Sequence, residues 1–477
     1  MVEPVEIPAT PEQLRLEKKE IVGVCLLFLI FRWMMLFWFQ PAYSEFAQYL
    51  YPFMLLSDPG YVGQYGLQPA LPFIDYWLEY PPVFPWIALG IYRINMGIFG
   101  TGGGGPTAFA DAVSMFLSAV DLANMLLIYM IAKKVLNHRF AMRCTVGYAL
   151  LFFPLVVSTC YFDSLVLCSM LLSLWAMING KAALAGGAVG FGIMTKFIPG
   201  VMALVALKYL AKKPEPGDPY KKDWGRLVHY FGAMVLTMGV LASTFLIVRP
   251  DLLEMPLRVT LARPGWETFR AIVEGNYDVG HIGPSDTHLT SDDYCASISS
   301  PYMAAVRGQK LDNVREPIRE LFRLRIASRF TDNCDYIPPP QDSLKWPLLI
   351  VIGAIYLIAV LFSPVEPSPL NYAAVTCITV ATGFVYSSGW SPQFIIYMLP
   401  LIMLSLWPRV NLFFAVALSV VNFMEMPLWL FYVQTPADPG KEFLAVVIVL
   451  RTVLLCIVSA LAFYNMSLQA KKPEMNY

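Results

Sequence analysis

Carboxylates and aromatic side chains gather in one short stretch, residues 75–84, which reads DYWLEYPPVF. A carboxylate beside a hydroxyl group can remove or orient its proton as a general base. Two consecutive prolines hold the preceding backbone extended, which would fix Glu79 and Tyr80 in place. A polar loop with interfacial aromatic residues is the plainer interpretation of this stretch. The acidic residues singled out in and before this stretch are Glu45, Asp58, Asp75 and Glu79.

Ionisable residues also lie in or beside apolar segments. Asp163 in CYFDSL and Lys196 in MTKFIPG each stand at a junction between two such segments. Charged groups there are costly unless they are paired or functional. The two could form a structural ion pair, or Lys196 could bind the phosphate of an anionic lipid head group. Asp121 and Glu425 are further candidates, either for function or as interhelical hydrogen bonders.

Two later motifs add aromatic and polar groups. RPGWETF contains Arg263, Trp266 and Glu267, and an arginine beside an aromatic ring could bind phosphate, stack on a sugar or merely anchor a loop. SSGWSPQF contains Trp390, an expected interfacial anchor, and Gln393, which is less expected at the mouth of an apolar segment.

The composition places these residues in a membrane protein. The chain is 57% hydrophobic and only 14% charged, against about 25% charged in soluble domains. Basic residues number 34 and acidic residues 34, and this balance argues against a nucleic-acid partner. We predict an all-α polytopic protein with about twelve spans. The predicted spans are 21–40, 112–134, 142–160, 161–178, 182–196, 197–211, 228–248, 346–363, 370–388, 392–407, 410–430 and 443–466.

Basic clusters such as KKVLNHR and KKPEPGDPYKK mark cytoplasmic loops, because Lys and Arg are enriched on that side. This rule predicts a cytoplasmic N-terminus at 1–20, a cytoplasmic tail at 467–477, and two exofacial loops at 41–111 and 249–345. Spans 2–7 then fall in 112–248 and spans 8–12 in 346–466. The apolar segment 84–100 is predicted to be a juxtamembrane helix on the outer surface, because a crossing there would reverse the side of KKVLNHR.

The eight cysteines show no zinc-binding spacing. Six lie in or beside apolar segments and are expected to be small buried hydrophobic residues. Cys295 and Cys334 share the long exofacial loop, where they could pair if the outside is oxidising.

The order of the motifs resembles glycosyltransferase family 87 of the GT-C superfamily of integral-membrane glycosyltransferases. That family runs acid-x3-Tyr, Gly-x2-Pro, Asp-Tyr and Glu-Tyr-Pro-Pro. The acid is usually Asp in the family, whereas it is Glu45 in this chain. The matching residues are Glu45 and Tyr49, Gly66 and Pro69, Asp75 and Tyr76, Glu79–Pro82, and later Phe162-Asp163, Lys196, Gly265–Thr268 and Ser391–Gln393.

The resemblance implies single inverting transfer of a sugar, most commonly mannose, from a polyprenyl-phosphate donor to a glycolipid or glycan acceptor at the outer face. It implies Glu45 as base, with Asp58, Asp75 and Glu79 as alternates. Lys196 and Arg263 would hold the donor phosphate. The implied substrate-binding residues are Tyr49, Glu79, Tyr80, Asp163, Trp266, Glu267, Trp390, Gln393 and Glu425. No cofactor is certain, and a divalent metal held by the carboxylates stays open.

Two other functions remain. A flippase for lipid-linked sugars would need polar residues along a path between both faces, but here they gather on the predicted outer side. A ligase that transfers a whole glycan is expected to have a more arginine-rich outer site than this chain offers.

Overall fold

The computed structural model describes residues 10–38, 44–64, 68–75, 78, 80–212, 223–250, 253–254, 256–257, 260, 266–273, 345–363, 365–387, 389–433 and 440–470. These residues form helices and no β-strand, as the predicted fold class requires. The chain is therefore an all-helical membrane protein in its described part.

The first thirteen elements carry the first loop and the first group of apolar helices. They are α1 (Pro11–Trp38), η1 (Phe46–Leu50), α2 (Tyr51–Leu55), α3 (Pro59–Gly63), α4 (Val83–Phe99), α5 (Gly105–Val135), α6 (His138–Leu150), α7 (Phe152–Cys160), α8 (Asp163–Ile178), α9 (Ala182–Ile193), η2 (Ile198–Val201), α10 (Met202–Tyr209) and α11 (Trp224–Val248).

The remaining elements begin with a short helix and end with the longest apolar helix of this half. They are α13 (Phe269–Val273), α17 (Lys345–Tyr356), η5 (Leu357–Leu361), α18 (Pro369–Tyr386), η6 (Pro392–Phe394), α19 (Ile395–Ser405), α20 (Asn411–Phe423), η7 (Met424–Val433) and α21 (Lys441–Ala470).

Four of the described helices are long and apolar enough to cross a bilayer alone: α5, α11, α21 and the helix Asn411–Leu430 that α20 begins. A fifth span results if α6 and α7 count as one. Helices occupy every predicted span at least in part, but the number of about twelve stays a prediction.

The predicted span 142–160 is not one straight helix. It divides into α6 and α7, which meet at an angle of 56°. Pro154 lies in the first turn of α7 and has no N–H to donate to the carbonyl of Leu150, so the hydrogen-bond ladder cannot continue. Leu151 between the helices is correspondingly extended.

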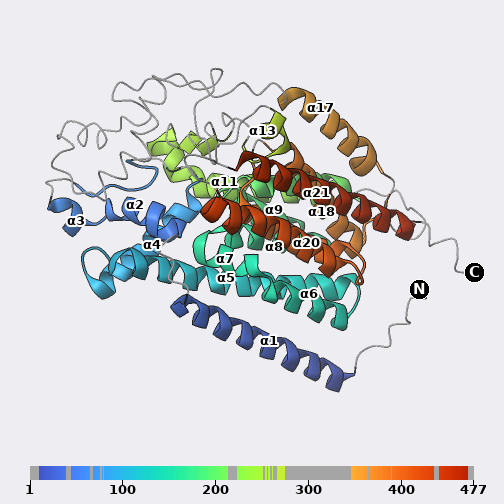
Figure 1. The fold of residues 1–477 in the computed structure, drawn as a ribbon, viewed down its shortest axis with the longest axis horizontal. Coiled ribbons are helices and arrows are strands. Elements are labelled where there is room, and N and C mark those ends of the chain that lie inside the picture. Colours follow the sequence, from blue (N-terminus) through green and yellow to red (C-terminus); the bar gives the residue numbers. More distant parts are fainter. Residues whose placement is uncertain are drawn as a thin grey trace, which may run out of the picture.

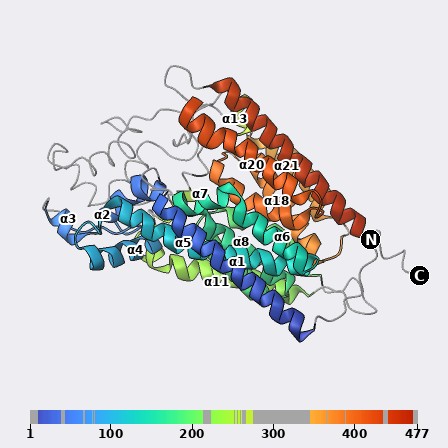
Figure 2. The same ribbon diagram turned by 60° about the horizontal axis from the view of Figure 1, so that its bottom comes forward.

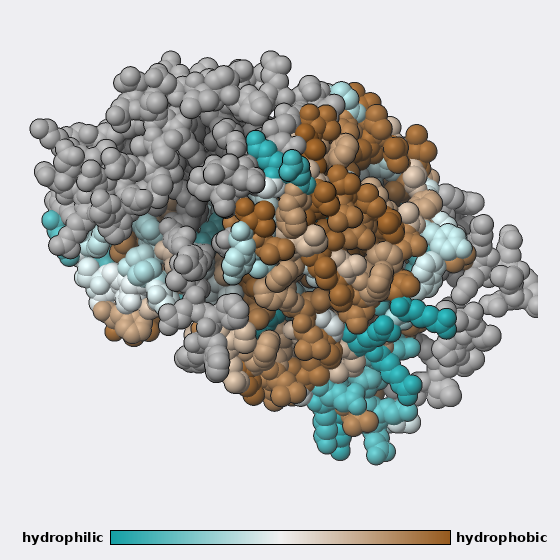
Figure 3. Space-filling view, viewed as in Figure 1, coloured by the Kyte–Doolittle hydropathy of each residue, from teal (hydrophilic) through white to brown (hydrophobic). Residues whose placement is uncertain are grey.

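The views in Figures 1 and 2 show the small helices of the first loop at one end of the bundle. Helices α2, α3 and α4 gather there, whereas α1 begins and α21 ends at the opposite end. Figure 3 shows a broad apolar face over the helices, with hydrophilic side chains at the lower right, where α1 begins. Such a belt suits contact with lipid.

Helix α9 packs very closely on α11 through two glycines. A Cβ atom at Gly186 would lie 1.9 Å from the carbonyl oxygen of Tyr230, and one at Gly190 would lie 2.5 Å from that of Met234. Small residues four apart let two helix backbones approach in a membrane. This contact fixes the end of α9, and with it the turn that carries Lys196.

Candidate active site

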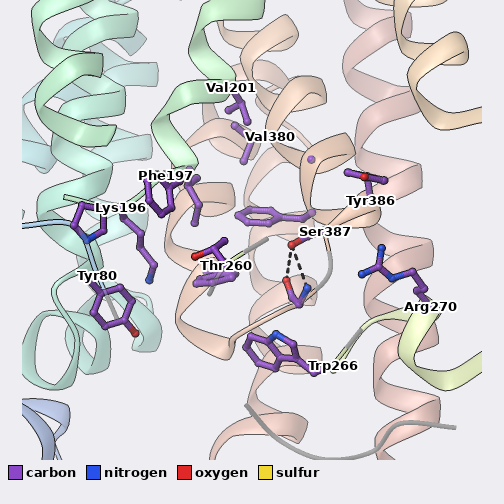
Figure 4. A pocket seen from close by; sticks show the side chains of 16 residues that line it. Tyr80, Lys196, Phe197, Val201, Thr260, Trp266, Arg270, Val380, Tyr386 and Ser387 are labelled. Atoms are coloured by element: carbon purple, nitrogen blue, oxygen red, sulfur yellow. Dashed lines mark hydrogen bonds between the residues drawn. The ribbon is translucent and has the colours of Figure 1, made fainter. Parts of the chain in front are cut away.

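A cavity of about 410 Å³ opens beside the end of α9, between η2, α18 and the segment that leads into α13. In Figure 4, Lys196 and Tyr80 form one wall, Arg270 reaches in from the opposite side, and Trp266 lies across one end. The other end is lined by Val201 and Val380. The cavity is therefore cationic and aromatic at one end and apolar at the other.

Lys196 lies in the short turn between α9 and η2, where its backbone N–H donates to the carbonyl of Gly192 over 2.8 Å. Its ammonium donates to Asp163 Oδ1 over 2.7 Å, and both side chains are almost fully buried. Asp163 begins α8, where a carboxylate suits the positive end of the helix dipole. The side-chain hydroxyl of Tyr397 donates to the same oxygen.

Aromatic rings surround this ammonium. The ring centroids of Phe394, Tyr80 and Phe162 lie 4.7, 5.2 and 5.3 Å from the Lys196 Nζ. The ion pair between Lys196 and Asp163, one of the two alternatives that the sequence allowed, is thus present. It borders the cavity and is not closed off from it. A cation held by one carboxylate and three rings can still attract a second anion that enters the cavity.

Glu45 lies on the other side of the same aromatic group. It borders a gap of about 10 Å³ that is also lined by Tyr80, Phe84 and Phe162. The Tyr80 and Phe162 rings meet edge to face at 4.7 Å between centroids. Tyr80 lines both the gap and the cavity, so one ring connects the surroundings of Glu45 with those of Lys196.

Asp58 is fully engaged with its neighbours. Its side chain caps α3 by accepting from the N–H groups of Gly60 and Tyr61 at 2.9 and 3.1 Å. It also accepts from the Tyr92 hydroxyl at 3.0 Å and from the N–H of Gly102 at 2.7 Å. This carboxylate fastens the glycine-rich turn before α5 to the first loop. Asp75 Oδ2 likewise accepts from the N–H of Leu71 at 2.7 Å.

Three predicted substrate-binding residues form a separate buried cluster with an arginine from α21. Arg451 donates to the Glu425 carboxylate and to the backbone carbonyl of Glu267. Its guanidinium lies 4.4 Å from the centroid of a Trp390 ring. Burial, with the Glu425 carboxylate nearby, raises the pKa of Glu267 well above its usual range. These residues adjoin the cavity without lining it.

Several predicted residues lie elsewhere or outside the described part. Gln393 lies in η6, the turn that leads into α19, where its side-chain oxygen accepts from Ser391 Oγ, and it does not line the cavity. Glu79, Arg263, Cys295 and Cys334 lie outside the described residues, and so does the side chain of Tyr49. The six other cysteines are free thiols; Cys144 and Cys377 are buried as expected, whereas Cys456 is exposed.

Arg270 is the main residue that the sequence did not single out. It lies in α13, is 2% exposed and lines the cavity. Its only mark in the sequence is its place four residues after Trp266 in WETFR. The partners of Asp121 and Glu425, Arg32 and Arg451, were also not foreseen.

No group of three or more His, Cys, Asp or Glu side chains that could hold a metal ion occurs among the described residues. The described carboxylates among those that the sequence offered as oxygen ligands are dispersed: Asp58 caps α3, Asp75 accepts from a backbone N–H, and Glu45 lines the aromatic gap. These three side chains do not form a metal site together.

A family model described as dolichyl-phosphate-mannose-protein mannosyltransferase matches residues 79–242, about a third of the chain. A search of curated proteins finds no significant match. The matched segment runs from the proline pair to α11 and includes Asp163 and Lys196.

Solved structures provide distant similarities. The oligosaccharyltransferase of Archaeoglobus fulgidus in its apo form is 12% identical, with a TM-score of 0.32, and the match covers 93% of this chain and 56% of that one. ArnT from Cupriavidus metallidurans, bound to undecaprenyl phosphate, is 12% identical, with a TM-score of 0.38 and coverage of 94% and 77%. The chain thus spans little more than half the length of the archaeal enzyme. Residues 79–242 are thus similar to the dolichyl-phosphate-mannose-protein mannosyltransferase family, in a chain whose described helices include several long and apolar enough to cross a membrane.

Proposed function

We propose that the chain is a membrane glycosyltransferase that transfers a single sugar, mannose by family resemblance, from a polyprenyl-phosphate donor to a hydroxyl of a glycolipid or glycan at the outer face. The observation that carries the proposal is the cavity between Lys196 and Arg270. Its two cations suit a phosphate, and its apolar end suits the first part of a lipid chain.

Glu45 is the proposed base. It removes the proton from the acceptor hydroxyl while the oxygen attacks C1 of the donor sugar. The bond between C1 and the phosphate oxygen breaks, the electron pair leaves with polyprenyl phosphate, and the configuration at C1 inverts. The family match to a mannosyltransferase description supports this reaction class and makes mannose the first donor to test.

The two cations would stabilise the charge that develops on the departing phosphate. Lys196 is already oriented by Asp163 and the surrounding rings, so little rearrangement is needed as the charge grows. We assign Arg270, which lines the cavity, to the phosphate-binding role that the resemblance implied for Arg263. Tyr80 and Trp266 supply stacking surfaces for the sugar.

Of the other carboxylates, Asp58 is the weakest candidate base. It accepts four hydrogen bonds from fixed donors, and these occupy the lone pairs that a base needs. Asp75 accepts a hydrogen bond from the N–H of Leu71 and stays an alternate, as does Glu79.

The test is transfer by purified protein in detergent from labelled polyprenyl-phosphate mannose, arabinose or glucose to a mixed glycolipid extract. Wild type is compared with Glu45→Gln and Arg270→Gln. Matched controls are Glu366→Gln and Arg143→Gln, which change exposed residues of the same types. Transfer that only the first two variants lose supports the proposal.

Transfer that survives Glu45→Gln would move the base to Asp75 or Glu79. A wild type that is silent with all three donors, yet moves lipid-linked sugar across liposomes, would replace the transferase with a flippase.

A further inference from the structure

Trp266 rests directly on Gly389. A Cβ atom built at residue 389 would lie 1.9 Å from the indole Nε1 and 2.1 Å from Cε2. The two backbones form an isolated parallel bridge, and the Trp390 N–H donates to the Trp266 carbonyl over 3.2 Å. Only glycine at 389 leaves room for the indole where it lines the cavity.

The next residue, Glu267, has a φ of 50°, in a region that residues other than glycine seldom adopt. Such a conformation persists only where the surroundings hold it. Here the carbonyl of Glu267 accepts from Arg451. The same guanidinium donates to Glu425 and stacks on Trp390. One buried side chain of α21 therefore joins the segment that carries Trp266 to the turn on which Trp266 rests.

This cluster is costly to bury, since a charged pair loses its hydration on entering the bundle. Arg451 and Glu425 are 2% and 1% exposed, and neither lines the cavity. The cluster reaches the cavity wall through Trp266 and Gly389, and through Trp390, whose ring centroid lies 5.1 Å from that of Phe384. Its effect on a ligand must therefore pass through these wall residues, among them the indole that it holds through both neighbouring segments.

We propose that Gly389 and Arg451 are positioning residues that hold Trp266 in the cavity wall and thereby set the affinity for the donor. This inference rests on the proposed function. Trp266 lines the cavity but not the gap beside Glu45. Moving the indole should weaken donor binding equally in the ground and transition states, which raises KM and leaves kcat nearly unchanged.

The first test needs no activity. Gly389→Ala is made in wild type and in Trp266→Ala, and thermal unfolding is followed in detergent. Alanine at 389 should lower the unfolding temperature by about 2–4 °C in wild type. In Trp266→Ala it should lower that temperature by much less, because the effects of substitutions at two residues in contact are not additive. Gly232→Ala is the control, since a Cβ there meets nothing within 4 Å.

Equal losses in the two backgrounds would overturn the contact between Trp266 and Gly389. Arg451→Lys and Arg451→Met extend the test, because lysine keeps the charge but lacks the planar fork that binds two acceptors at once. Lysine should restore part of the stability that methionine loses. If both variants lose the same amount, the bridging role of Arg451 is wrong.

The second test is kinetic. Gly389→Ala should raise the KM for the donor about three- to tenfold, the loss expected for one aromatic contact, with kcat within about twofold of wild type. A lower kcat at unchanged KM would overturn the inference. A wild type without transfer would count against the proposed function alone, whereas additive thermal losses would count against the positioning of Trp266.

Discussion

Two buried ion pairs, Arg32–Asp121 and Lys196–Asp163, have the same chemistry but different surroundings. Arg32 donates to Asp121 over 3.0 Å, and the side chains are 1% and 0% exposed. Asp121 also accepts from the Tyr148 hydroxyl at 2.5 Å and from Asn124 at 3.3 Å. This pair joins α1 to α5 and α6, and neither of its members lines a described cavity.

Lys196–Asp163 faces a cavity on one side. The comparison teaches that a buried charge is not by itself evidence of function, because a sealed pair can serve only to join helices. In the sequence, Asp121 and Asp163 were equivalent candidates for function, because both are ionisable residues in or beside apolar segments. What separates them is whether a ligand can reach the partner cation.

Removing one partner of the sealed pair should have the largest effect on stability. Arg32→Met leaves Asp121 buried without its cation, which costs about 3–5 kcal/mol of unfolding free energy. The double variant Arg32→Met with Asp121→Leu should recover most of that loss. The free energy of unfolding of both variants is measured in detergent. A double variant as unstable as Arg32→Met would contradict the assignment of Arg32–Asp121 as a sealed structural pair.

The same replacement at the cavity should separate stability from activity. The double variant Lys196→Met with Asp163→Leu removes both charges and should fold, but transfer should fall about 10²–10³-fold, as on loss of one preorganised donor. Labelled transfer and unfolding are measured on the same sample. Activity that is retained by the folded double variant would make this pair as structural as the first.

Asp58→Asn tests the engaged carboxylate of the first loop. An amide has one acceptor oxygen and cannot satisfy all the donors around it, so unfolding free energy should fall by about 1–3 kcal/mol. Loss of transfer should follow the loss of folded protein. If folded Asp58→Asn is as inactive as Glu45→Gln, the base assignment is wrong.

The last prediction compares Tyr148 and Tyr397, the two tyrosines that donate to the carboxylates of the two ion pairs. Tyr148→Phe and Tyr397→Phe each remove one hydrogen bond to a buried carboxylate, worth about 1.5–3 kcal/mol. Only Tyr397→Phe should also change the pH profile or KM of transfer, because Asp163 orients the cavity cation. Equal kinetics for both would remove this distinction.

Composition and local pattern were enough to predict much of the fold. Apolar runs predicted the helical membrane class, and helices fall in each predicted span, because hydrophobic length is a local property. The helix at 84–100 was also predicted, and α4 spans Val83–Phe99. The bend between α6 and α7 was missed, although Pro154 was visible, because a proline can either begin a helix or break one.

The sequence alone determined which residues are candidates for the site. From their residue types and from the order of the motifs it indicated Lys196, Asp163, Tyr80 and Trp266. Tertiary structure alone decided which of them share a cavity. The cavity is lined by Lys196, Tyr80 and Trp266, together with Arg270, which was not predicted. Arg451 instead donates hydrogen bonds to the Glu425 carboxylate and to the Glu267 carbonyl. The physical reason is that contacts between helices distant in the chain depend on packing and close backbone approach, such as Trp266 on Gly389, which no local pattern encodes.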